Sequence, residues 1–150
     1  MWEEGWRESH LGRVPPELLA HRTSATFRSR AADRVASTIV AMCRVGADES
    51  LAGFVTVIDD EVEQLYVDRR RRGQGVADHL LGRAEELIAI RFDAAWLAVV
   101  DDNGRARAFY ERCGWHDAGH FDNPAETTDG TILVPCRRYE KRVGTEGPDA

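Results

Sequence analysis

The sequence has a single lysine, Lys141, and only three cysteines among its 150 residues. Cys43, Cys113 and Cys136 form no C-x-x-C pair, so they indicate neither a disulfide framework nor a zinc knuckle. No apolar run approaches the ~20 residues of a membrane span. The opening segment, MWEEGWRESH, lacks the basic and then apolar pattern of a signal peptide. We therefore expect a cytoplasmic protein that does not bind a membrane.

A basic excess is also missing. The chain carries 20 Lys and Arg residues against 26 Asp and Glu residues, a formal net charge of −6. Proteins that bind nucleic acid over a whole face are normally basic, so we expect no nucleic-acid partner. A hydrophobic content of 43% with 31% charged residues is typical of a soluble globular protein. We expect one domain over residues 1–142 and a disordered tail over residues 143–150.

The periodicity of apolar residues predicts helices first and then a sheet with an inserted helical crossover. Strand, helix and strand in succession require a crossover, so the strands at 61–67 and 94–100 should be parallel neighbours. Asn103 is a good helix N-cap, and Gly114 is placed to end that helix. The predicted elements are helices within 2–34 (the second beginning at Pro16), a hairpin of strands at 35–45 and 51–58 joined by a loop at 46–50, a strand at 61–67, a helix from 76 to about 90, a strand at 94–100, a helix at 103–114, and strands at 115–121 and 131–142 flanking a loop at 122–130.

The segment RRRRGQGVADHLL, residues 69–81, places two glycines where the third strand passes into a helix. Without side chains, Gly73 and Gly75 let a ligand approach the main chain, and the N–H groups at the helix start favour phosphate oxygens. Arg72, with Arg70 as a second candidate, adds charge-assisted contacts. These features predict a pyrophosphate ligand.

Two common nucleotide motifs do not fit this segment. A P-loop needs a lysine and a hydroxyl that are missing here, and the dinucleotide fingerprint has Asp78 in place of its third glycine. The pattern that fits is R-x-x-G-x-[GA]. It is followed by NGRARAFYERCGW, which matches N-x-x-A-x-x-F-Y-x-x-x-G-F except that Trp115 replaces the phenylalanine. Together, over residues 35–140, the two motifs resemble the GCN5-related N-acetyltransferase (GNAT) family.

The resemblance implies an α/β (α+β) fold with a single mixed, mostly antiparallel twisted sheet, whose central parallel strands splay apart for the cosubstrate acetyl-CoA. Splayed strands leave main-chain groups unpaired, and these groups would bind the pantetheine arm and polarise the carbonyl. The residues that the resemblance assigns to acetyl-CoA are Leu65, Tyr66, Val67, Arg72, Gly73, Gln74, Gly75, Val76, Ala77, Asn103, Ala106, Phe109 and Tyr110.

Direct acetyl transfer to a primary amine needs a base and an acid. An alkyl ammonium with a pKa near ~10.4 must lose a proton before it attacks. Glu63 or Glu61 could accept this proton, with Glu63 favoured because it is nearer the loop; both could instead be surface carboxylates of a hairpin. Tyr110 is the expected proton donor to the CoA thiolate, the alternative being a core tyrosine. Cys113 is expected to pack rather than react.

Other features are expected to have no catalytic role, or they depart from the family pattern. His116 and His120 lack a third ligand, so no metal site is expected. Asp68 stands where a proline is common. Residues 1–34 show no first strand, which the family normally has, and another subunit of a homodimer would be one way to cover the missing edge.

The acceptor is expected to be an amine of a small molecule, a peptide or a protein, read mainly by the N-terminal helices and the loop at 122–130. Two other functions stay open. The chain could be a non-catalytic CoA-binding module of the same fold, serving regulation or assembly. Alternatively, the arginine run could contact nucleic acid, although aromatic interleaving is absent.

Overall fold

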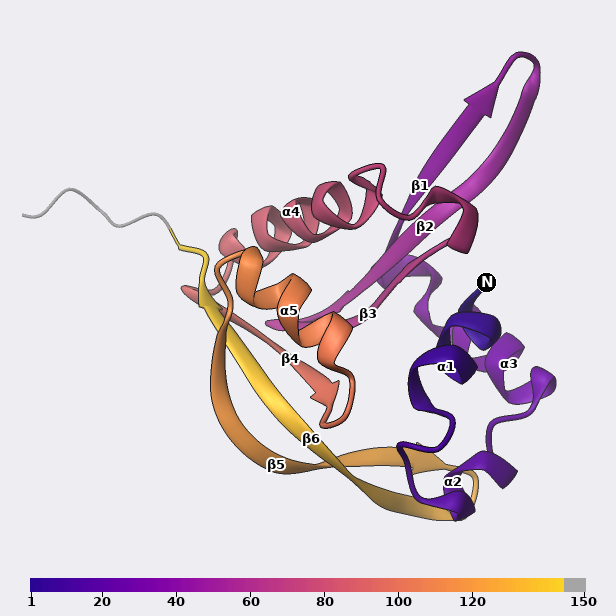
Figure 1. The fold of residues 1–150 in the computed structure, drawn as a ribbon, viewed down its shortest axis with the longest axis vertical. Helices are drawn as coiled ribbons and strands as arrows, with labels where there is room; N and C mark the ends of the chain where they lie inside the picture. The colour runs from indigo at the N-terminus through magenta and orange to yellow at the C-terminus, as the bar shows by residue number, and fades with distance from the viewer. Residues whose placement is uncertain (145–150) are drawn as a thin grey trace, which may run out of the picture. The chain divides into compact units, whose positions relative to one another are not determined.

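The computed structural model describes residues 1–144. They form a mixed six-stranded sheet with helices, in the strand order β1-β2-β3-β4-β6-β5 (Figure 1), which confirms the predicted fold class. No helix of the described part is long and apolar enough to cross a membrane. The bounds are α1 Trp2–His10, α2 Pro16–Ala20, α3 Ser24–Arg34, η1 Val35–Ser37, β1 Thr38–Val45, β2 Asp48–Ile58, β3 Glu61–Val67, η2 Arg69–Arg71, α4 Val76–Ala89, β4 Ala94–Val100, α5 Gly104–Arg112, β5 His116–Thr127 and β6 Gly130–Arg142.

The chain divides into two compact units. The first unit contains residues 1–36 and 98–139, and the second contains residues 37–97 together with residues 140–144. Near the end of the second unit, the N–H groups of Val143 and Gly144 donate to the carbonyl of Asp93 at 2.9 and 3.1 Å. The rest of the predicted tail, residues 145–150, lies outside the described residues.

In the second unit, β1 and β2 form the predicted antiparallel hairpin, but the connection is shorter than expected. The predicted loop at 46–50 is wrong, because β2 already begins at Asp48. Val45 pairs with Asp48 and Arg44 with Glu49, whose side chains form an ion pair across the strands. Gly46 supplies the positive φ of +64° that this tight turn requires.

Helix α4 packs on β1, β2 and β3 within the second unit, and the hairpin of β1 and β2 runs well beyond the end of the helix (Figure 1). The apolar stripe of α4 follows the 3.6-residue period of a helix. Gly53 of β2 is needed for this packing, because a Cβ there would lie 2.7 Å from the Tyr66 carbonyl oxygen and 3.1 Å from Leu80 Cδ1. The residues of α4 that are buried are Leu80, Leu81, Ala84 and Ile88.

Strands β3 and β4 are parallel, as predicted. In the register of these two strands, Glu61 pairs with Trp96, near the start of both strands. The Trp96 N–H donates to the Asp60 carbonyl at 3.0 Å, and the Trp96 indole nitrogen lies 3.2 Å from Asp60 Oδ1. The crossover through α4 therefore brings the two strands together at this end.

In the first unit, the N-terminal helices are built around aromatic rings. Phe27 packs against Trp2 and Trp6 with ring centroids 5.5 and 5.8 Å apart. Arg22 is buried over the Trp6 ring and donates from Nη1 to the Glu126 carbonyl of β5 at 3.0 Å. Before Thr38 the described chain has helices and no strand, so the family's expected first strand is absent.

The late hairpin of the first unit differs from its prediction. The predicted loop at 122–130 is wrong, because β5 continues to Thr127 and β6 begins at Gly130. Pro124 lies inside β5, where it would break a central strand. It is tolerated because β5 is an edge strand, whose outer side needs no ladder hydrogen bond.

Candidate active site

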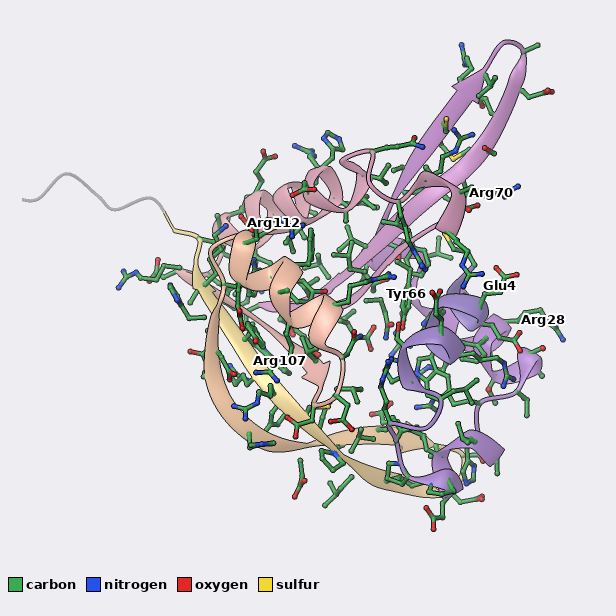
Figure 2. The ribbon with its side chains drawn as sticks, in the orientation of Figure 1. Glu4, Arg28, Tyr66, Arg70, Arg107 and Arg112 are labelled. Atoms are coloured by element: carbon green, nitrogen blue, oxygen red, sulfur yellow. The ribbon has the colours of Figure 1, made fainter. Side chains whose placement is uncertain are left out.

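The loop between β3 and α4 begins with a carboxylate cap. Asp68 accepts from the Arg70 N–H at 2.8 Å and forms an ion pair with Arg70 Nη2 at 2.8 Å. These contacts lower the pKa of the Asp68 carboxyl to about 2. Arg70, labelled in Figure 2, is therefore engaged within the loop, and Gln74 Nε2 also donates to its carbonyl at 3.3 Å.

The two glycines of the loop take left-handed conformations. Gly73 has φ +74° and Gly75 has φ +81°. A Cβ built at either position would meet nothing within 4 Å, so packing does not require these glycines. The left-handed backbone conformation favours glycine at both positions, and the space that a side chain would fill there is open.

Gly75 is also the N-cap residue of α4. The first backbone bond of the helix joins the His79 N–H to the Gly75 carbonyl at 3.0 Å. Within residues 1–144, no side chain caps this end of α4. A helix start of this kind, with Arg72 next to it in extended conformation, can bind phosphate oxygens.

Strand β3 carries the two candidate bases. Its register with β2 shifts between Thr56 and Val57, because Thr56 pairs with Gln64 whereas Val57 pairs with Val62. Glu63 is therefore the extra residue of a β-bulge. Bulges occur often beside active sites because they redirect side chains.

The residues that follow the bulge restore the regular register. Leu65, Tyr66 and Val67 pair with Val55, Phe54 and Gly53, and the rings of Tyr66 and Phe54 lie 5.6 Å apart. The second unit thus holds both candidate carboxylates, the predicted main-chain segment of residues 65–67 and the loop of residues 72–77 along one strand-loop-helix connection.

The remaining predicted residues lie in the first unit, on or next to α5. Asn103 caps the helix by accepting from the Ala106 N–H at 3.2 Å. Gly114, at φ +84°, follows the helix as expected. The structure therefore brings Asn103, Ala106, Phe109 and Tyr110 together as one group within the first unit.

Tyr110 lies among aromatic rings. Its centroid is 5.2 Å from that of Phe109, 6.2 Å from that of Trp115 and 6.3 Å from that of Tyr139. Burial, with a smaller contribution from Cys113, raises the pKa of Tyr110 above its ordinary value. The phenol therefore keeps its proton at neutral pH, as a proton donor must.

Two features were not predicted from the sequence. The bulge at Glu63 has no glycine or proline to indicate it. The contacts of Tyr139 with Arg107 and Glu111 of α5 join residues about thirty positions apart, and a single sequence gives no sign of such a pairing.

His120 pairs with Asp101 at 3.4 Å, in an ion pair that depends on protonation of the histidine.

The model of the acetyltransferase (GNAT) family matches residues 2–115 of this chain. The match covers more than half of the sequence, and the chain belongs to this family of acetyltransferases.

Solved structures share the fold. A structure described as a GCN5-related N-acetyltransferase from Rhodopseudomonas palustris is 17% identical, covers 93% of this chain and 81% of its own, and has a TM-score of 0.65. The ribosomal-protein-S18-alanine N-acetyltransferase from Escherichia coli is 23% identical, with coverage of 82% and 80% and a TM-score of 0.56. Spermidine N-acetyltransferase from Vibrio cholerae, in complex with CoA and spermine, is 20% identical, with coverage of 78% and 74% and a TM-score of 0.52.

Proposed function

We propose that the protein is an N-acetyltransferase that moves the acetyl group of acetyl-CoA directly to a primary amine. The observation that carries this proposal is the loop before α4. Gly73 and Gly75 have positive φ and leave open space at the start of α4. The N–H groups of a helix start, together with the positive charge of Arg72 in the preceding loop, suit the diphosphate of acetyl-CoA.

The reaction forms a C–N bond and breaks a C–S bond. The amine nitrogen attacks the thioester carbonyl, and its proton passes to Glu63 or Glu61, directly or through water. Main-chain groups of residues 65–67 polarise the carbonyl. The departing CoA sulfur then takes the proton of Tyr110. Glu63 is the favoured base because the bulge and its position nearer the loop set it apart from Glu61.

The first experiment tests the proton donor. Tyr110→Phe keeps the ring and removes the acid, so we expect kcat to fall about 100-fold, within the range for general acid catalysis. The Kd for acetyl-CoA, measured by calorimetry, should stay nearly unchanged. Unchanged turnover would remove Tyr110 from the mechanism.

The acceptor is an amine of a small molecule, a peptide or a protein. Two neighbours illustrate the range, since one is described as acetylating the alanine of a ribosomal protein and another is bound to spermine. Thiol release should therefore be measured with polyamines, with peptides that begin with alanine and with peptides that contain lysine. Binding of acetyl-CoA without turnover on any amine would favour the alternative, a non-catalytic CoA-binding module.

We also propose that the protein forms a homodimer. Strand β1 lies at one edge of the sheet, and its apolar side chains Val40 and Met42 are 53% and 56% exposed. An apolar edge strand is a template for a further strand. A second copy of β1, which carries the same residues, would cover it in a symmetric interface.

A further inference from the structure

Tyr139 of β6 has a buried hydroxyl with two polar partners. The residue has no exposed surface (0%). Its hydroxyl oxygen accepts from Arg107 Nε at 3.3 Å and donates to Glu111 Oε1 at 2.7 Å. Burial and Glu111 raise the pKa of Tyr139, against the opposing effect of Arg107, so the hydroxyl remains a donor. A phenylalanine would fill the same space without burying a polar group, so the hydroxyl calls for an explanation beyond packing.

Both partners lie on α5, on either side of Tyr110 in the sequence. Arg107 (labelled in Figure 2) and Glu111 are four residues apart, on successive turns of the same helix face. Their attachment points are about 6 Å apart along the helix axis. Two bonds at different heights hold a helix against both rotation about its axis and movement along it.

The ring of Tyr139 adds a third contact, because its centroid lies 6.3 Å from that of Tyr110. The anchoring also extends outward. Arg107 Nη2 is 3.4 Å from Asp117 Oδ2 in β5, and Arg137 Nη1 in β6 is 3.1 Å from the same oxygen. The Arg107 side chain of α5 is thus bonded to both β5, through Asp117, and β6, through Tyr139.

We propose that Tyr139 is a positioning residue for acetyl transfer, whose hydroxyl fixes α5 through Arg107 and Glu111 and so sets the direction of the Tyr110 phenol. The inference rests on the proposed function, in which Tyr110 supplies the proton to the leaving sulfur. A misplacement of about 1 Å at a reacting group can cost up to 100-fold in rate, so a helix that shifts slightly would lose activity while it remains folded.

The main test is Tyr139→Phe, which keeps the ring and removes both hydrogen bonds. We expect kcat to fall about tenfold or more, whereas the Kd for acetyl-CoA should stay within about twofold. Thermal unfolding, recorded in parallel, confirms that the variant is folded at the assay temperature. A wild-type kcat would overturn the proposal, and so would a loss of acetyl-CoA affinity equal to the loss of kcat.

A second pair of variants tests the partner on α5. Glu111→Gln keeps an oxygen that can accept from the Tyr139 hydroxyl, whereas Glu111→Ala does not. We expect Glu111→Ala to lower kcat as Tyr139→Phe does, and Glu111→Gln to recover most of the loss. Arg105→Ala, an exposed change on the same helix, is the control and should retain wild-type kcat. Equal kcat values for the two Glu111 variants would overturn the proposal.

Tyr110→Phe separates failure of this proposal from failure of the proposed function. If it is impaired while Tyr139→Phe is fully active, the positioning role is wrong and the proton donor stands. If Tyr110→Phe itself turns over at the wild-type rate, the donor role fails, and the positioning role fails with it.

Discussion

At the scale of single residues, Gly75 gives the sharpest test of acetyl-CoA binding. Gly75→Val places a side chain in the open space before α4 and strains a backbone at φ +81°. We expect acetyl-CoA binding to be abolished in calorimetry, because the side chain blocks approach to the helix start.

The matched control is Gly12→Val. Gly12 has a similar φ of +74° and also meets nothing within 4 Å, but it lies outside the predicted loop. Both variants should lose about 1–2 kcal/mol of stability through backbone strain, and only Gly75→Val should lose binding. Wild-type affinity in Gly75→Val would contradict the assignment of the diphosphate to this loop.

His10 predicts a pH dependence of stability. Its ring stacks on Trp6 at 4.7 Å, and burial, with smaller effects of Arg22 and Arg13, lowers its pKa to about 4. An unfolded histidine has a pKa near ~6.5, so between these values the unfolded state binds a proton that the folded state does not. The free energy of unfolding should therefore fall as the pH drops from about 6.5 to 4, by up to about 3 kcal/mol from this residue.

His10→Phe tests this by keeping a ring on Trp6 and removing the titration. Urea unfolding at several pH values between 4 and 6.5 should show a shallower loss of stability for the variant than for the wild type. Parallel curves for the two proteins would show that His10 is not responsible.

At the scale of elements, Asn103 at the start of α5 is proposed both to stabilise the helix and to bind acetyl-CoA. Asn103 Oδ1 caps the helix, and because the family resemblance also assigns Asn103 to acetyl-CoA, we propose that its side-chain amide donates to the pantetheine arm. Asn103→Asp keeps an oxygen for the cap and loses the amide donor, so stability should be retained while acetyl-CoA affinity falls. Asn103→Ala should lose both, with a stability cost of about 1 kcal/mol.

Thermal unfolding and calorimetry distinguish these outcomes. If Asn103→Asp binds acetyl-CoA as the wild type does, the residue is a helix cap and nothing more.

Elements with a strong local signal were predictable from the sequence. The period of the apolar stripe predicts α4, and the alternation in residues 61–67 predicts β3. The extension of β5 through Pro124 was missed because tolerance of proline depends on a strand's place in the sheet. The bulge at Glu63 was missed because it results from pairing with β2.

The same contrast holds for the candidate site. The backbone roles of Gly73, Gly75 and Asn103 were predictable because only a few residue types fill each role well. The anchoring by Tyr139 was not, because it depends on contacts between distant segments. Periodicity and capping residues predict the local structure of each unit. The pairing of side chains that are distant in the sequence depends on the tertiary structure.

At the scale of the whole molecule, the two edges of the sheet differ in their protection. The edge strand β5 contains Pro124, and its exposed positions include the charged residues Asp122 and Glu126. Proline and charges on an edge strand discourage pairing with a further strand. The other edge strand, β1, has the sequence TIVAMCRV, with Arg44 as its one charged residue. An unprotected apolar edge of this kind is expected to be covered in solution.

The proposed homodimer predicts a specific response to substitution. Val40→Lys places a charge on the exposed side of β1, where the wild-type residue is 53% exposed, and should shift the protein from dimer to monomer in sedimentation velocity. Leu133→Lys in β6, at a position that is 56% exposed, is the control and should leave the dimer intact. If Leu133→Lys dissociates the dimer equally, the interface lies elsewhere. If the wild-type protein sediments as a monomer at every concentration tested, β1 remains an open edge, and its apolar side chains then predict aggregation that Val40→Lys suppresses.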